Sequence, residues 1–237
     1  MYALGCIPTP DNIEYDNVGN HLAMISPLPE YYTLIDTLPP VRDQGLKGSC
    51  VAHAVACMKE SQEFKDVNYK DYFSPIFIYN NRSNKEQNGM YIRDALNIIQ
   101  TQGILPEKRY PYDYDEDVKL SKRVVKIAKN YRIANFCRVQ TMEELKYSLM
   151  ESGACPVAFP IYSYHGKIWK SSGKLLGYHA MAIVGWNPEG FVLRNSWGIK
   201  WGAGGYTIYP YEDWGAHCEI WTSTDNKSIP ERSKWFC

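Results

Sequence analysis

Helical and strand-like patterns occupy separate parts of this chain, and this separation limits its fold more than any other feature. Helices are predicted to begin at Ser49, Ser74 and Ile92, from apolar spacing, N-cap residues and a proline at a first helical position. After about residue 155, short runs rich in β-branched and aromatic residues alternate with glycine, proline and asparagine. Helices followed by strands predict an α+β architecture with two lobes.

Local signals place the ends of several elements. Gly103 is the predicted stop of the helix that begins at Ile92. Thr141 and Glu144 form a capping-box pattern at the start of another helix. The predicted strands cover residues 156–162, 179–186, 190–195 and 205–209, with a hairpin turn at 187–190. Residues 118–131 fit either a surface strand or a short helix, and both readings stay open.

The chain divides into three predicted segments. Residues 1–37 are extended and proline-spaced, because proline fixes φ and favours an extended residue before it. Residues 38–117 form the helical lobe, and residues 118–237 form the β-rich lobe. We expect the first segment either to wrap over the folded body or to be partly disordered.

Composition excludes several classes of protein. Hydrophobic residues make up 45% of the chain and the formal net charge is zero, so no basic field attracts nucleic acid or an anionic membrane. No apolar run is long enough to span a bilayer, and the N-terminus lacks the pattern of a secretory signal. We expect a monomer in the cytoplasm, with a virion or a host cell as the alternative location.

Seven cysteines are present, and no two form a CxxC pair, so a zinc site has no support. One of them, Cys50, follows Gly48 and Ser49 at the predicted start of a helix. A helix N-terminus and a nearby imidazolium both lower the pKa of a thiol, which turns cysteine into a strong nucleophile. The alternative is a buried helix cysteine such as Cys57.

Gln44 lies six residues before Cys50. Its carboxamide N–H, beside the backbone N–H of Cys50, would donate to the oxyanion of an acyl-transfer reaction. The alternative is an ordinary surface glutamine in a loop.

His179 begins a predicted strand, and Asn195 ends the next one. Hairpin-linked strands bring such side chains together, so Asn195 would accept a hydrogen bond from the imidazole and fix its tautomer. Trp197 would cover that bond, although a plain core tryptophan is the alternative. The competing histidines are His21, His53, His165 and His217.

Taken in order, these motifs resemble the papain family of cysteine peptidases, in particular its bacterial and viral members. The resemblance covers roughly residues 38–212. The motifs that carry it are Gln44…Gly48-Ser-Cys50, Asn88-Gly89, Tyr110-Pro-Tyr112, Tyr178-His179-Ala and Asn195-Ser-Trp197-Gly198…Trp201-Gly202…Gly204-Gly205-Tyr206.

The resemblance implies a papain-like two-lobe fold, with a helical left lobe and an antiparallel β-barrel-like right lobe. It implies an endopeptidase that forms a thioester acyl-enzyme, with Cys50 as nucleophile, His179 as acid and base, Asn195 as orienter and Gln44 as oxyanion donor. No metal or organic cofactor is expected. The substrate is a peptide or protein, and the residues expected to bind it are Gly89, Met90, Tyr91, Pro160, Tyr178 and Trp197.

The chain departs from the family pattern at several positions. Lys47 and Gln87 stand where the family has a disulfide pair, which agrees with a reducing compartment. Val51 replaces an aromatic residue, and Met90 replaces a second glycine. Only about 40 residues precede the nucleophile motif, so we expect residues 1–35 to fold across or beside the cleft and restrain activity. Cys6 would then lie near Cys50.

Two other functions fit the same residues. A papain-like scaffold whose thiol is idle would act as a binding or regulatory module. A related acyl transfer, such as transpeptidation, deamidation or isopeptide cleavage, would use the same thioester. The sequence does not reveal the physiological substrate or the cleavage preference.

Overall fold

The computed structural model describes residues 2–10, 16, 27–114, 118–171 and 173–226. Its helices are α1 (Cys50–Val67), α2 (Pro75–Asn80), α3 (Ile92–Thr101), α4 (Lys122–Ala128) and α5 (Met142–Ser152). Its strands are β1 (Tyr32–Thr33), β2 (Ile133–Arg138), β3 (Cys155–Ile161), β4 (Gly177–Asn187), β5 (Gly190–Arg194), β6 (Tyr206–Pro210) and β7 (Glu219–Asp225). Short 3₁₀ turns cover Ile35–Thr37, Glu107–Arg109, Lys129–Tyr131 and Tyr211–Asp213.

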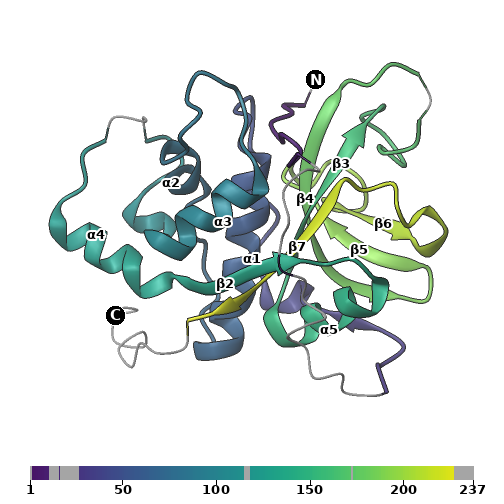
Figure 1. Cartoon of the computed structure of the whole chain (residues 1–237), viewed down its shortest axis with the longest axis horizontal. Helices are drawn as coiled ribbons and strands as arrows, with labels where there is room; N and C mark the ends of the chain where they lie inside the picture. The colour runs from purple at the N-terminus through teal and green to yellow at the C-terminus, as the bar shows by residue number, and fades with distance from the viewer. Residues whose placement is uncertain (1, 11–15, 17–26, 115–117, 172, 227–237) are drawn as a thin grey trace.

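The strands form one antiparallel sheet in the order β2-β7-β3-β4-β5-β6, with β1 paired to β4. Helices α1 to α4 gather on one side of the molecule and strands β3 to β6 on the other, as Figure 1 shows. This arrangement confirms the predicted α+β class, with helices early in the chain and most of the sheet late.

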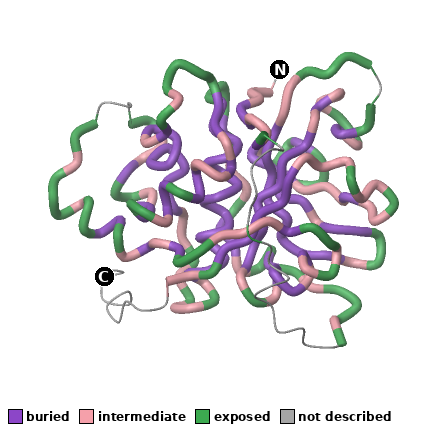
Figure 2. Tube along the Cα trace, in the orientation of Figure 1, coloured by how far each residue is buried: buried purple, intermediate pink, exposed green. Residues whose placement is uncertain are grey.

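Each side of the molecule has its own apolar cluster. One cluster joins the helices α1 to α3 with Ile127, Tyr131 and Trp221. The other lies within the sheet and includes Phe159, Trp186 and Trp197. Helix α1 runs between the two, and the first fourteen of its eighteen residues, Cys50 to Glu63, are buried. Figure 2 shows the buried backbone concentrated where α1 meets the sheet.

The burial of α1 places charged side chains in the interior. Lys59 is fully buried, and its ammonium group pairs with Glu63 at 2.7 Å and with Asp225 at the end of β7. A buried charge is tolerated only when it is paired, so this cluster holds the helix against the last strand.

Several predicted elements have the expected ends. Gly103 follows α3 with a φ of +82°, and Thr141 and Glu144 form both hydrogen bonds of the capping box at α5. The hairpin between β4 and β5 turns at Asn187, whose side chain accepts from the amides of Glu189 and Gly190. Ser49 precedes α1, but its side chain makes no capping bond.

Other parts of the fold were left open by the sequence or were not predicted, and for residues 118–131 the helix is the reading observed. Residues 122–128 form a helix, α4, and its residues Ile127 and Ala128 pack in the helical cluster. Strands β2 and β7 were not predicted, because their sequences lack a clean alternation of apolar and polar residues.

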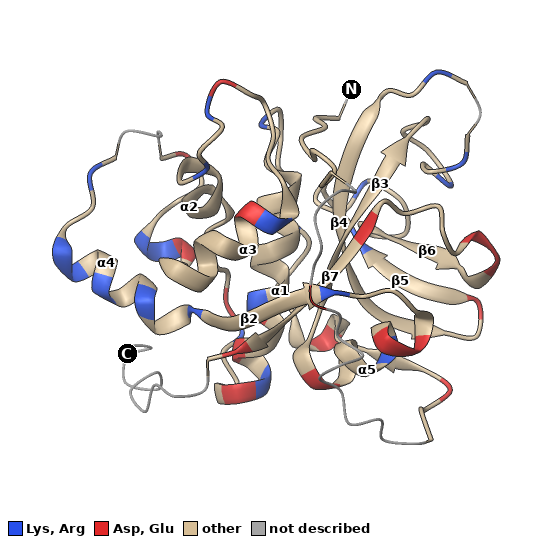
Figure 3. Ribbon diagram, in the orientation of Figure 1, with Lys and Arg blue, Asp and Glu red and all other residues tan. Residues whose placement is uncertain are grey.

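No helix within the described ranges has both the length and the apolar character needed to cross a lipid bilayer. Positive charge gathers along α4, at Lys122, Arg123, Lys126 and Lys129, well away from the junction of helices and sheet (Figure 3).

Candidate active site

Cys50 is the first residue of α1, and it faces the sheet across the junction of the two sides. Its side chain is fully buried. The backbone N–H groups of Ala180, which follows His179 on β4, and of Gly5 point toward its sulfur. Burial raises the pKa of the thiol to about 11, and these N–H groups offset only part of that effect. In this arrangement Cys50 is therefore a neutral thiol at neutral pH.

His179 lies near the start of β4 and is held by Asn195. The histidine Nε2 is 2.7 Å from the Asn195 Oδ1, so Nε2–H donates and the proton is fixed on that nitrogen. The Nδ1 atom has no partner among the described residues, so it remains as the acceptor for a proton. Burial lowers the pKa of His179 to about 4, against a smaller opposing effect of the Asn195 bond.

Trp197 covers the bond between His179 and Asn195. Its ring stacks on the imidazole with centroids 4.2 Å apart, and only 2% of its surface is exposed. The structure therefore places Trp197 where the sequence predicted a cover over this bond, and the ring excludes water from it.

Gln44 is buried beside the start of α1 and is fixed from the sheet side by Ser196. Its backbone N–H donates to the Ser196 carbonyl at 2.8 Å, and its Oε1 accepts from the Ser196 hydroxyl at 2.6 Å. This second bond determines which way the carboxamide faces, so Nε2 is the atom turned toward the cleft. There Nε2 donates to the Lys47 carbonyl at 2.9 Å and to the Ala3 carbonyl at 3.3 Å.

The last contact belongs to a segment that lies between the two sides, residues 2–10, which we call the N-terminal strap. Met90 donates its N–H to the Gly5 carbonyl at 2.9 Å and accepts from the Ile7 N–H at 3.0 Å. On the opposite wall, the Tyr178 carbonyl accepts from the Cys6 N–H at 3.3 Å. The strap thus hydrogen-bonds to both walls at once.

The ends of the strap fix its direction. At one end, Tyr2 stacks on Trp197 with centroids 4.5 Å apart and rings nearly parallel. At the other end, the Thr9 N–H donates to the Glu219 carboxylate at 3.3 Å. Cys6 lies between these ends, buried in the same apolar cluster as Cys50, and the charge of a Cys50 thiolate raises the pKa of Cys6 further beyond the effect of burial.

The strap fits closely because there is glycine at its centre and on the helical wall beside it. A Cβ at Gly5 would lie 2.0 Å from the Gly48 carbonyl oxygen, and one at Gly89, whose φ is +149°, would lie 2.6 Å from the Gly5 carbonyl oxygen. Neither position has room for a side chain.

The remaining residues expected to bind substrate lie along the same walls. Pro160 on β3 pairs in register with Tyr178 on β4, and Met90 is fully buried. Tyr91 is the N-cap of α3, directly after Met90.

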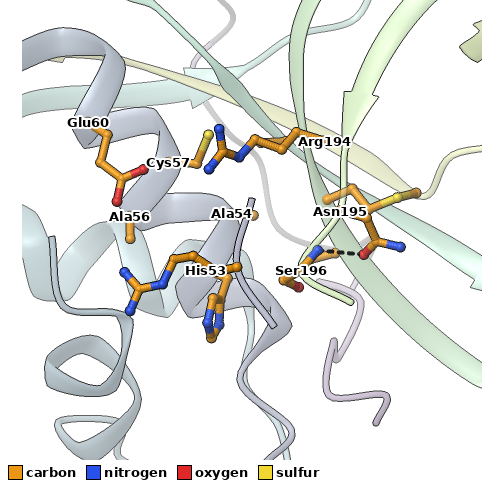
Figure 4. A pocket seen from close by; sticks show the side chains of 12 residues that line it. His53, Ala54, Ala56, Cys57, Glu60, Arg194, Asn195 and Ser196 are labelled. Carbon is orange, nitrogen blue, oxygen red and sulfur yellow. Dashed lines mark hydrogen bonds between the residues drawn. The ribbon is translucent and has the colours of Figure 1, made fainter. Parts of the chain in front are cut away.

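A small cavity lies behind the candidate site, between α1 and strands β4 and β5. The volume open to the centre of a water molecule is about 20 Å³, enough for one water. Figure 4 shows Glu60 and Arg194 reaching toward it from α1 and β5, with Asn195 and Ser196 on the sheet side. Burial raises the pKa of Glu60 to about 7, and the charge of Arg194 opposes this.

The competing histidines lie elsewhere. His53 is buried on α1 with its Nδ1 2.9 Å from the Ser49 carbonyl oxygen, and His217 bonds to the Tyr209 hydroxyl. His165 is exposed in a turn, and His21 lies outside the described residues.

Sequence reasoning missed Ser196 and Glu219. Ser196 had a signal, since it directly follows Asn195 and a hydroxyl there reaches the Gln44 side chain. Glu219 had none, because its carboxylate is directed into the cleft by pairing with Arg138 at 2.9 Å and with the Trp221 ring N–H at 2.8 Å. The six cysteines within the described ranges are thiols, with no disulfide among them.

Comparison with known proteins places these features in a family. The sequence profile of papain family cysteine proteases matches residues 33–226. An uncharacterized peptidase C1-like protein of Acanthamoeba polyphaga mimivirus is 30% identical over 203 residues, which cover 72% of this chain and 64% of that protein. Papain of Carica papaya is 28% identical over 191 residues, which cover 76% of this chain and 54% of papain.

Solved structures agree. Xylellain, a cysteine protease from Xylella fastidiosa, matches with a TM-score of 0.82 at 26% identity, over 95% of this chain and 97% of that chain. This chain spans less than two thirds of the length of the two curated relatives described above. The profile and the structure together confirm the resemblance drawn from the motifs.

Proposed function

Because the chain belongs to the papain family of cysteine proteases, we propose that it is an endopeptidase in which Cys50 attacks the scissile carbonyl of a bound peptide. The single observation that carries this proposal is the hydrogen bond of 2.7 Å between His179 Nε2 and Asn195 Oδ1. It leaves Nδ1 as the acceptor for the Cys50 proton, which is the tautomer that a general base for this thiol needs.

The proposed reaction proceeds in two steps. In the first, His179 takes the thiol proton, the Cys50 sulfur bonds to the carbonyl carbon, and the leaving amine departs with a proton from the imidazolium. In the second, His179 activates a water molecule that cleaves the thioester and restores the thiol. The Gln44 Nε2–H and the Cys50 backbone N–H would stabilise the oxyanion in both steps.

The N-terminal strap, in this proposal, is the chain's own inhibitor. Its Gly5 N–H points toward the Cys50 sulfur, so the strap lies over the nucleophile. Its Ala3 carbonyl accepts from the Gln44 Nε2, the donor that the oxyanion would use.

With the strap in place, Cys50 and His179 are also kept in their uncharged forms. Burial raises the pKa of Cys50 to about 11 and lowers that of His179 to about 4, and both shifts favour the neutral forms. Once the strap leaves, water reaches both groups and the thiolate–imidazolium pair becomes accessible.

A thiol-directed peptidyl epoxide tests the proposed nucleophile. We expect one covalent adduct per chain, mapped to Cys50 by mass spectrometry, and no adduct or peptide hydrolysis with Cys50→Ala. Hydrolysis that survives this substitution would refute the proposal. Product masses from a peptide library distinguish hydrolysis from transpeptidation, since only hydrolysis adds one water for each bond cleaved.

A further inference from the structure

We propose that Tyr112 is a positioning residue that holds the oxyanion donor in place relative to the nucleophile. This inference rests on the proposed peptidase function, because it assigns Tyr112 a role in the same reaction. Tyr112 lies in the loop after the 3₁₀ turn Glu107–Arg109, on neither the segment of Gln44 nor the helix of Cys50.

One hydroxyl group joins the two parts of the site. The Tyr112 O–H donates to the Gln44 backbone carbonyl at 2.8 Å, and the Ser49 Oγ lies 2.7 Å from the same oxygen. Since a phenol has a single proton, the Ser49 hydroxyl is the donor in the second bond. Tyr112 therefore connects the residue that carries the proposed oxyanion donor with the residue directly before Cys50.

The segment between these two points is anchored at its ends, where Ser196 holds Gln44 and Asn88 holds Gly48, while its middle is exposed. Gly45 and Leu46 are exposed, Leu46 at 86% of its surface, and the φ of Gly45 is +62°. Residues 45–47 gain no support from burial, whereas Gln44 and Gly48 on either side of them are buried. The anchors of the segment are hydrogen bonds, among them the Gly48 N–H to the Asn88 side chain at 3.1 Å and the two bonds of Tyr112.

The Tyr112 hydroxyl is suited to this role because it stays protonated. Burial raises the pKa of Tyr112 to about 12, so the group remains a donor at any pH at which the enzyme would work. Its ring is held separately, by the Lys47 ammonium 5.3 Å above it and by the edge of His53 at 5.2 Å. Phenylalanine would keep both ring contacts and lose only the hydroxyl.

The position of Gln44 matters most when negative charge develops on the substrate oxygen. A donor displaced by a fraction of an ångström binds the ground-state carbonyl almost as well but stabilises the oxyanion less. We therefore expect Tyr112→Phe to lower kcat about 10-fold, with KM changed less than 2-fold; such a loss corresponds to about 1.4 kcal/mol.

The chain supplies a matched control in the same motif. Tyr110 is buried where Tyr112 is partly buried, its hydroxyl accepts from the Asn80 side chain at 3.1 Å, and it forms no hydrogen bond with Gln44 or Ser49. Tyr110→Phe removes a hydroxyl group from the tyrosine two positions earlier in the sequence. It therefore reports the effect of a lost tyrosine hydroxyl on folding alone.

Two thiol reagents separate positioning of the oxyanion donor from activation of the nucleophile. A peptide aldehyde forms a hemithioacetal whose oxygen occupies the oxyanion site, whereas iodoacetamide alkylates the sulfur without forming an oxyanion. The strap must leave before either reagent reacts, so it reduces the aldehyde affinity and the alkylation rate by the same factor. The ratio of these two quantities therefore does not depend on how often the strap is open.

We expect this ratio to fall about 10-fold in Tyr112→Phe and to stay within 2-fold of the parent in Tyr110→Phe. An unchanged ratio in Tyr112→Phe, or an equal fall in both variants, would overturn the assignment. If the parent chain forms no aldehyde adduct and is not alkylated at Cys50, the proposed peptidase function itself fails, which is a different result from an unchanged ratio.

Discussion

Gly5→Ala is predicted to release the N-terminal strap and activate the enzyme. The added methyl group would lie 2.0 Å from the Gly48 carbonyl oxygen, whereas ordinary van der Waals contact begins at 3.4 Å. The Gly48 oxygen is a backbone atom and the Cβ is fixed to the backbone of the strap, so the strap must retreat by more than 1 Å to relieve the clash.

That movement breaks the bonds that hold the centre of the strap. They are the bonds that join Gly5 and Ile7 to Met90 and the one that joins Cys6 to Tyr178. At about 1 kcal/mol for each bond, the free energy that favours the closed position of the strap decreases by roughly 3 kcal/mol. This corresponds to an increase of about 100-fold in the ratio of open to closed chains.

The assay is the second-order rate of Cys50 alkylation together with the hydrolysis of a fluorogenic peptide, measured on the full chain. We expect both rates to rise together, up to about 100-fold if the parent chain is mostly closed. Gly166→Ala is the control for a strained alanine away from the strap, since its φ of +66° costs about 1–2 kcal/mol while a Cβ there meets nothing within 4 Å. Rates that do not rise in Gly5→Ala, while circular dichroism shows a native fold, would refute the inhibitory role of the strap.

Three further outcomes follow from the geometry. Asn195→Ala, measured in the Gly5→Ala chain, removes the hydrogen-bond acceptor of His179 and is expected to lower kcat by about 10- to 100-fold. The rate of Cys50 alkylation at high pH should change little, because there the thiol ionises without the imidazole. Lys59→Met leaves Glu63 and Asp225 without their buried cation, so chemical denaturation should show a loss of about 3–5 kcal/mol, and a loss under 1 kcal/mol would contradict the described burial. His179 takes up a proton near pH 6.5 in the unfolded chain but only near pH 4 in the closed fold, so the free energy of unfolding should decrease as the pH is lowered from about 6.5 to about 4. His179→Gln should remove this decrease from the pH profile of stability.

The sequence could predict which residues meet at the proposed site because the signals for them are local. Short stretches of residues predict the helix start at Cys50, the strand start at His179 and the hairpin turn at Asn187. Once the hairpin forms, the pairing of β4 with β5 brings His179 and Asn195 to hydrogen-bonding distance without further information.

Features that depend on tertiary contacts were harder to predict. Strand β7 carries Glu219 and pairs with both β2 and β3, far apart in the chain, and its charged residues are tolerated only because Arg138 and Lys59 meet them. The hydroxyl bridge of Tyr112 joins residues 63 and 68 positions away, which no local pattern reports.

The pH dependence of Cys50 alkylation tests the central claim most directly, namely that Cys50 and His179 form a reactive pair once the strap leaves. In the Gly5→Ala chain we predict rapid iodoacetamide labelling of Cys50 at pH 6, and a loss of that labelling when His179→Ala is added. The parent chain should be labelled only slowly until the pH approaches 11. Labelling of Cys50 in the Gly5→Ala chain that is no faster at pH 6 than in the parent, or that is unaffected by the loss of the imidazole, would contradict the account.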